Sequence, residues 1–270
     1  GIERNISQIY GSDHMTRRDS MDYGVVVQSY WDAPTAGLIA NYQVGAGDQI
    51  LVKMAISYTS IENAWENLNV ELDHWNFDLV QENAEHEWNE MLQRIEVIGG
   101  SEQQQIKFYT DLWHVLLGRK IINDVKGTYP DYTQGERNWK FTKSDLKVRK
   151  LPMNKSGKPL FNMYNSDALW LTHWNLNVLW GLAWPEILDD FSASLVQYAK
   201  NGGLLPRGPN VGGYSYIMTG NPATSLLVSA YQKGIMNKTS PEVAFDIMNK
   251  NHKPYYFPNS SKVIHQLEKF

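Results

Sequence analysis

A loop rich in glycine and proline carries the side chains best suited to hold a polar ligand. Residues 202–213 contain five glycines, two prolines and one charged residue, Arg207. Tyr214 and Tyr216 follow, on either side of Ser215. A guanidinium group and two phenols can donate hydrogen bonds to the hydroxyl groups of a ligand, and long loops in compact domains are often functional. The pattern indicates a binding rim, with a plain helix-to-helix connection as the alternative.

Two helices must position this rim. Pro185 suits the first position of the earlier helix, and Gly202 and Gly203 provide the left-handed backbone that ends it. The later helix is expected from Pro222 to Gly234, where glycine again ends the periodic pattern. The rim therefore connects the end of one apolar helix to the start of another.

The first part of the chain predicts strands. Three runs are rich in Val and aromatic residues or alternate between apolar and polar residues: Val25–Tyr30, Leu38–Val44 and Gln49–Tyr58. A period of two is typical of half-buried antiparallel strands.

At Ser60 the apolar period becomes helical. Ser60 is expected to cap one helix, and Asp78 with Gln81 forms a capping-box pattern that opens a second helix ending near Ile95. A third helix is expected from Ser101, with its own capping box, to Gly118.

Two segments between this helix and the rim have predicted structures of different kinds. Residues 119–137 are expected to form a long loop. The segment Asn165–Trp184 is apolar on almost every side and contains four tryptophans, which predicts a buried helix.

Composition excludes several classes of protein. The chain has 270 residues and a net charge of −4, which gives no electrostatic reason to expect nucleic acid or anionic membranes as partners. It has no cysteine, so disulfides and thiolate metal sites are excluded. No stretch reaches the roughly 20 apolar residues that a membrane span needs.

The order of four motifs resembles glycoside hydrolase family 92, the calcium-dependent exo-acting α-mannosidases. The motifs lie in Ile50–Leu72, Phe108–Tyr129, Ala168–Thr172 and Gly202–Gly234. The last of these aligns without gaps to the family pattern G-G-W-L-P-K-W-E-x-x-G-N-E-T-x-x-M-x-G. Family members have a β-sandwich, a helical linker and an (α/α)6 barrel, and they are generally exported.

The resemblance implies an α+β fold class with three parts. Residues 1–59 would be the C-terminal part of the β-sandwich, residues 60–100 the helical linker, and residues 101–270 the first part of the (α/α)6 barrel. Fewer helices are expected after Ser101 than such a barrel needs. We therefore expect the chain to be part of a longer polypeptide or a truncated relative, and to be exported.

Two departures from the family pattern affect the chemistry. Tyr214 stands where the family has the glutamate that protonates the leaving oxygen, and a phenol with a pKa near about 10 is a poor proton donor at neutral pH. Leu171 stands where the family has a sugar-binding aspartate. Asp167 lies four residues earlier, about one helical turn away, and could make that contact. The family's catalytic base and part of its calcium site lie beyond Phe270.

The resemblance implies a mannose-containing glycan as the partner and calcium as the cofactor. Calcium prefers oxygen ligands, so it can bind the hydroxyl groups of a sugar. The expected substrate-binding residues are Asp124, Asn165, Asp167, Trp170, Arg207 and Tyr214. Three of them have structural alternatives: Asp124 could cap a turn, Asp167 could cap a helix, and Trp170 could pack in the core.

The function expected from the resemblance is calcium-assisted, inverting hydrolysis of α-mannosides or related glycans. A leaving group that departs without a proton, such as a phosphate diester, would not need the missing acid. A carbohydrate-binding relative without catalysis and a structural or assembly component are the alternatives.

Overall fold

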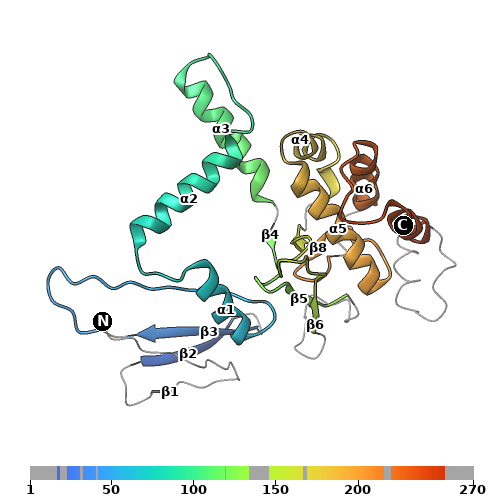
Figure 1. Cartoon of the computed structure of the whole chain (residues 1–270). Coiled ribbons are helices and arrows are strands. Elements are labelled where there is room, and N and C mark those ends of the chain that lie inside the picture. The colour runs from blue at the N-terminus through green and yellow to red at the C-terminus, as the bar shows by residue number, and fades with distance from the viewer. Residues whose placement is uncertain are drawn as a thin grey trace. The chain divides into compact units, whose positions relative to one another are not determined.

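The computed structural model describes residues 42–118, 120–133, 146–166, 169–215 and 220–252, together with the backbone of three strands before them. The chain divides into two units, Gly1–Val52 and Lys53–Phe270 (Figure 1). In the described part of the chain, helices contain more residues than strands, so the fold is a mixed, helix-rich one with few strands, in agreement with the expected α+β class. The sandwich and the barrel stay predictions.

The first unit contains one antiparallel sheet. Its strands are β1 (Arg17–Arg18), β2 (Tyr23–Tyr30) and β3 (Ala33–Ala40), in that order across the sheet. The register pairs Tyr23 with Ala40 and Tyr30 with Ala33. The expected strand Val25–Tyr30 is therefore confirmed, whereas the expected strand Leu38–Val44 overlaps β3 only at residues 38–40, and residues 42–44 have no regular structure.

The expected strand at Gln49–Tyr58 is wrong. The segment has no regular structure, and its alternating apolar side chains are exposed, Met54 by 86%. A strand needs a neighbouring backbone to accept and donate its hydrogen bonds. Among the described residues, no strand pairs with this segment. The alternation of apolar and polar residues is therefore present, but the strand pairing that it predicts is not.

The three expected helices of the second unit's first part all form. Helix α1 (Ile61–Glu71) is capped by Ser60, whose hydroxyl accepts a hydrogen bond from the Asn63 amide. Helix α2 (Phe77–Leu92) is capped by Asn76, two residues before the expected Asp78. Helix α3 (Glu102–Leu117) has the predicted capping box between Ser101 and Gln104.

The expected loop at residues 119–137 contains two short strands instead. Strand β4 (Lys120–Ile121) pairs with β7 (Tyr164–Asn165), and β5 (Thr128–Asp131) pairs with β6 (Lys147–Lys150), both antiparallel. Each partner strand lies later in the sequence, so local pattern alone did not reveal the pairing. We call residues 120–133 and 146–166 the β module.

The tryptophan-rich segment is not one buried helix. It comprises a 3₁₀ turn, η2 (Leu169–Leu171), and the short helix α4 (Leu176–Ala183). Trp180 is buried in the core, whereas Trp174 is 73% exposed and Leu182 is 79% exposed. When a segment is apolar on every side, its sequence does not reveal which side packs against a neighbouring element. The prediction of a single buried helix is wrong for this reason.

Helix α5 (Pro185–Gly202) is the centre of the main core. It contacts α4, α6 (Pro222–Gln232) and α7 (Pro241–Asn251), as Figure 1 shows. Phe191 and Leu195 of α5 belong to the same buried cluster as Leu226 of α6. The predicted start at Pro185 is confirmed, and Gly203 ends the helix in the left-handed conformation with φ 89°.

Candidate functional site

The predicted rim is a small hairpin rather than an irregular loop. Strands β8 (Pro209–Asn210) and β9 (Gly213–Tyr214) pair antiparallel across a two-residue turn, Val211–Gly212. Both turn residues have positive φ, 44° and 86°. Such turns match the twist of a hairpin. A Cβ on Gly212 would lie 2.2 Å from the Pro130 carbonyl oxygen, so the hairpin rests directly on the β module.

Val211 is strained, because a β-branched side chain is disfavoured at positive φ. Three hydrogen bonds hold the turn in place. The Val211 amide donates to Asn165 Oδ1 at 2.8 Å, and the Gly212 amide donates to the Tyr198 hydroxyl at 3.3 Å. The Gly212 carbonyl accepts from the Tyr132 amide at 2.9 Å. Asn165, an expected sugar ligand, therefore has its side-chain oxygen engaged with the rim's own backbone.

We expect Val211→Asn to raise the free energy of unfolding by about 1 kcal/mol, because asparagine tolerates the left-handed conformation. Urea unfolding of the full chain measures the change. A destabilised variant would show instead that packing of the valine methyl groups outweighs the backbone strain.

Tyr214, at the family's general-acid position, has its hydroxyl inside the protein. The side chain is 8% exposed and belongs to a second buried cluster together with Tyr129 and Tyr198. Its hydroxyl donates to the carbonyl oxygens of Leu204 at 2.7 Å and Tyr198 at 3.1 Å. The fit is tight, because a Cβ on Gly202 would lie 2.1 Å from that hydroxyl oxygen. The phenol thus joins the rim to the end of α5.

The neighbouring tyrosines Tyr129 and Tyr198 are poor proton donors at neutral pH. Burial is the main cause that raises the pKa of Tyr198 and of Tyr129 above the usual tyrosine range. Tyr129 also accepts a hydrogen bond from Asn201 Nδ2 at 3.0 Å. These phenols stay neutral at physiological pH. Tyr198 contacts the rim at the Gly212 amide, and Tyr129 contacts Asn201 at the end of α5.

Asp124 lies in a polar network between α1 and the β module. It is buried, and its carboxylate accepts hydrogen bonds from Thr59 Oγ1 at 2.5 Å, Thr128 Oγ1 at 2.7 Å and Asn67 Nδ2 at 2.9 Å. Asn63 Nδ2 donates in turn to both threonine hydroxyls. This arrangement agrees with the structural alternative for Asp124, although the carboxylate holds two elements together rather than a single turn.

A second buried carboxylate was not singled out from the sequence. Asp131 Oδ1 accepts from the Thr133 amide at 3.0 Å and from its hydroxyl at 2.6 Å, and Oδ2 pairs with Arg149 Nε at 2.5 Å. Arg149 is paired across β5 and β6 with Tyr129. The ion pair forms because β5 pairs with β6, which lies well beyond it in the sequence. No local sequence motif predicts it.

Asp189 and Asp190, in the first two turns of α5, bind loops. Asp189 Oδ1 accepts from the amides of Asn237 and Lys238 at 2.9 and 3.0 Å. Asp190 Oδ2 accepts from the Asn162 amide at 3.1 Å, and Oδ1 forms an ion pair with the Lys238 ammonium group. The two carboxylates therefore fasten two separate loops to the central helix.

The remaining expected ligands are only partly placed. Trp170 and Arg207 are half-buried, in η2 and in the rim respectively, and Leu171 beside Trp170 is exposed. Asp167 lies outside the described residues. Among the expected ligands, the structure brings Asn165 together with the hairpin that carries Tyr214, whereas Asp124 belongs to a separate network.

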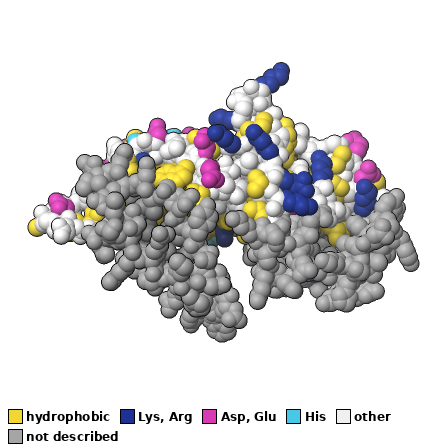
Figure 2. Space-filling model, turned by 90° about the horizontal axis from the view of Figure 1, so that it is seen from below, with side chains coloured by type: hydrophobic (Ala, Val, Ile, Leu, Met, Phe, Trp, Pro, Cys, Tyr) yellow, Lys and Arg dark blue, Asp and Glu magenta, His cyan; other side chains and the backbone are white. Residues whose placement is uncertain are grey.

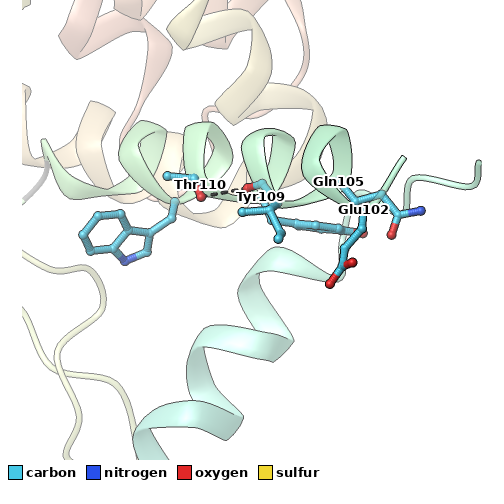
Figure 3. A pocket seen from close by; sticks show the side chains of 6 residues that line it. Glu102, Gln105, Tyr109 and Thr110 are labelled. Atoms are coloured by element: carbon cyan, nitrogen blue, oxygen red, sulfur yellow. Dashed lines mark hydrogen bonds between the residues drawn. The ribbon is translucent and has the colours of Figure 1, made fainter. Parts of the chain in front are cut away.

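A shallow groove of about 480 Å³ lies elsewhere in the second unit (Figure 3). Its lining comes from one face of α3: Glu102, Gln105, Ile106, Tyr109, Thr110 and Trp113. It contains a single carboxylate and none of the expected site residues. One helix face of this kind lacks the paired acid and base that glycoside hydrolysis requires.

The residues described here do not fit a calcium ion. No group of three or more His, Cys, Asp or Glu side chains comes together among them. The buried carboxylates Asp124, Asp131, Asp189 and Asp190 accept hydrogen bonds from separate parts of the chain. Calcium normally takes six to eight oxygen ligands, and the carboxylates of the described residues do not supply such a set in one place.

The described part of the chain is helix-rich with a few short strands, and its candidate rim is a hairpin between two helices. A sequence model of the glycosyl hydrolase family 92 catalytic domain matches residues 63–269, well over half of the chain. The chain therefore belongs to glycoside hydrolase family 92, as its motif order predicts. A comparison with curated proteins gives no match.

Solved structures of family 92 enzymes share the fold. A family 92 α-mannosidase from Bacteroides thetaiotaomicron is 22% identical, with a TM-score of 0.62 over 76% of this chain and 24% of its own. An α-mannosidase from the same organism in complex with mannoimidazole gives 22% and 0.63, over 74% and 24%. An inverting mannosidase from strain VPI-5482 is 24% identical, with a TM-score of 0.63 over 89% and 30%. The chain spans about a quarter to a third of their length.

In the part of the second unit that the structure describes, no helix is long and apolar enough to cross a membrane.

Proposed function

We propose that the protein acts as a glycosidase on α-mannosides or related glycans. The observation that carries this proposal is the match to the family 92 catalytic domain over residues 63–269. The likeness to α-mannosidase structures, one of them holding mannoimidazole, supports the same substrate class. The proposal includes an exported location, which rests on the family alone.

The finer architecture belongs to the same proposal. Residues 1–59 would end a β-sandwich, residues 60–100 would form the linker, and residues 101–270 would begin an (α/α)6 barrel. Helices α1 and α2 would then belong to the linker, and α3 would be the first barrel helix.

The proposed chemistry does not use Tyr214 as the acid. Its proton is already donated to backbone carbonyl oxygens, and moving the hydroxyl to a glycosidic oxygen would break the contact with Leu204. A phenol is also a weak proton donor at neutral pH. We infer that Tyr214 positions the rim, and that the substrate has a leaving group that departs without a proton, such as a phosphate diester.

Inversion would further require a base that activates water. In inverting enzymes that have both an acid and a base, the two carboxyl groups lie roughly 6.5–9.5 Å apart. The buried carboxylates Asp124, Asp131, Asp189 and Asp190 are engaged in structural contacts, so none of the four suits this role. Calcium belongs to the proposal through the family resemblance alone.

A glycosidase of this kind should release mannose from a mannose-1-phosphate diester and from an aryl α-mannoside faster than from an alkyl α-mannoside. The test uses the full-length protein with and without a calcium chelator. No turnover on any member of this panel would refute the proposal.

Tyr214→Phe distinguishes a positioning role from an acid role. We expect a loss of about 1 kcal/mol in the free energy of unfolding, because the hydroxyl proton shared between the Leu204 and Tyr198 carbonyl oxygens disappears. We expect the rate on the aryl α-mannoside to change less than about threefold, whereas loss of a general acid costs roughly 10²–10⁴-fold. A hundredfold loss in a fully folded variant would restore Tyr214 as the acid.

A carbohydrate-binding relative without catalysis is the second candidate. The buried hydroxyl of Tyr214 and the exposed apolar Leu171, at the two positions where the family pattern has carboxylates, favour it. Calorimetry with mannose oligosaccharides would then show binding, and the substrate panel would show no release of sugar.

A further inference from the structure

The β module and its flanks concentrate positive charge in an acidic protein. Residues 119–166 include 11 Lys and Arg against 4 Asp and Glu, a net charge of +7, within a chain of net charge −4. The rest of the chain therefore carries −11. Such a separation of charge creates a local positive potential that the overall net charge conceals.

Six of the seven described lysines and arginines of this segment lie on β6 and on two turns beside it. Along β6, Lys147 and Arg149 lie on one side of the strand and Lys150 on the other. Strand β6 contributes Lys147, Arg149 and Lys150, and two neighbouring turns contribute Lys126, Lys155 and Lys158. The turns are contiguous with β6, because the Leu151 amide donates to the Gly127 carbonyl at 2.8 Å and Gly127 packs against Met153 and Pro159. We call these six residues the basic face. Figure 2 shows Lys and Arg side chains gathered near the middle of the described surface, with acidic side chains mostly to either side.

Little negative charge balances this surface. Both acidic side chains of the β module's described residues, Asp124 and Asp131, are buried. Lys126 pairs with Glu66 at 2.8 Å, and Arg149 pairs with Asp131 through Nε alone. The other four cations have no ion pair among the residues described. Arg149 is held by a buried carboxylate while its side chain stays 38% exposed, which orders a guanidinium fork suited to an oxyanion.

The basic face borders the candidate rim. The Tyr132 amide, one residue beyond β5, donates to the Gly212 carbonyl at 2.9 Å, and Tyr129 of β5 bonds Asn201 at the end of α5. Arg149 lies opposite Tyr129 in the strand register. A ligand longer than one sugar that occupied the rim could therefore extend onto the β module.

We propose that the basic face binds the anionic groups of an extended glycan, whether phosphate, sulfate or carboxylate. The sugar part of this inference rests on the proposed function, and the anionic part rests on the charges and contacts of the β module. A long uniform polyanion such as nucleic acid fits less well, because the rest of the chain carries −11 and would repel it.

The experiment measures binding of the full chain to two mannans that differ only in charge: one with phosphodiester groups and the same mannan after their removal. Heparin, a carboxylated mannan, double-stranded DNA and anionic lipid vesicles are the further probes. The variant is Lys147→Gln with Lys150→Gln, and the matched control is Lys200→Gln with Lys250→Gln, two exposed lysines on α5 and α7.

We expect the phosphorylated mannan to bind more tightly than the neutral one at low salt. The Lys147 and Lys150 double variant should lose about tenfold in affinity for it, and the difference should fade near about 0.5 M salt, where the Debye length is a few ångströms. The control variant should lose less than about twofold. Heparin and carboxylated mannan identify which oxyanion the face accepts.

Equal binding of the charged and neutral mannans, unchanged in the double variant, would overturn this inference and leave the proposed function standing. Preferential binding of DNA or vesicles through Lys147 and Lys150 would overturn the glycan as the partner. Absence of binding to either mannan would count against both the inference and the proposed function, and sugar release from the substrate panel would then decide the function separately.

Discussion

Asp124→Ala is expected to lower the free energy of unfolding by about 3 kcal/mol, because one buried and two half-buried donors lose their acceptor at once. The effect should be large because the carboxylate connects α1 to the β module and does not serve a local turn alone. Urea unfolding monitored by tryptophan fluorescence measures it.

Asp111→Ala is the matched control for this substitution. Asp111 is an exposed aspartate that pairs with Lys107 at 2.6 Å on α3, and pairs of this kind contribute little. The control should stay within about 0.5 kcal/mol of the parent chain. A loss below about 1 kcal/mol for Asp124→Ala would mean that the network is not essential and would reopen a ligand-binding role for Asp124.

Gly212→Ala is expected to cost about 4 kcal/mol and to disorder the rim. The new Cβ would lie 2.2 Å from the Pro130 carbonyl oxygen, and the backbone at φ 86° already disfavours any side chain. Backbone carbonyl groups cannot move aside as a flexible side chain can. The unfolding free energy and the binding of mannose oligosaccharides should therefore both fall.

Gly157→Ala separates the two causes of this loss. Gly157 has φ 78° but no atom within 4 Å of the added Cβ, so only the conformational cost of about 1 kcal/mol should remain. Similar losses at both glycines would show that the hairpin does not rest tightly on the β module.

The role of Tyr214 combines sequence and structure. Its presence at the family's acid position is a matter of alignment, and the weak acidity of a phenol follows from its chemistry. Its hydrogen bonds to Leu204 and Tyr198 come from the fold alone. Together they make the tyrosine a support for the rim, in a family whose chemistry otherwise calls for a carboxylic acid at that place.

The net charge of −4 describes the chain as a whole and not its separate surfaces. It gave no reason to expect anionic partners, yet the β module gathers cations on β6 and on two turns beside it. Electrostatic potential depends on where charges lie and falls off over about 10 Å in 0.1 M salt. A local surface can thus differ in sign from the protein that carries it.

The sequence by itself determined the features that depend on neighbours along the chain. Capping at Ser60 and Ser101, the start of α5 at Pro185 and its end at Gly203 all rest on contacts within about four residues, and each is present. The order of four motifs likewise identified the family, which the match over residues 63–269 confirms.

Only the tertiary structure decided the features that depend on distant neighbours. The segment Gln49–Tyr58 has the strand period without a partner, and β5 finds its partner in β6, beyond an intervening stretch of chain. The same holds for Asp124 and Asp131, because a carboxylate becomes a ligand or a structural anchor according to the donors that folding brings to it. Hydrogen-bond donors from other elements reach a side chain only once the elements have packed, so no local pattern contains that information.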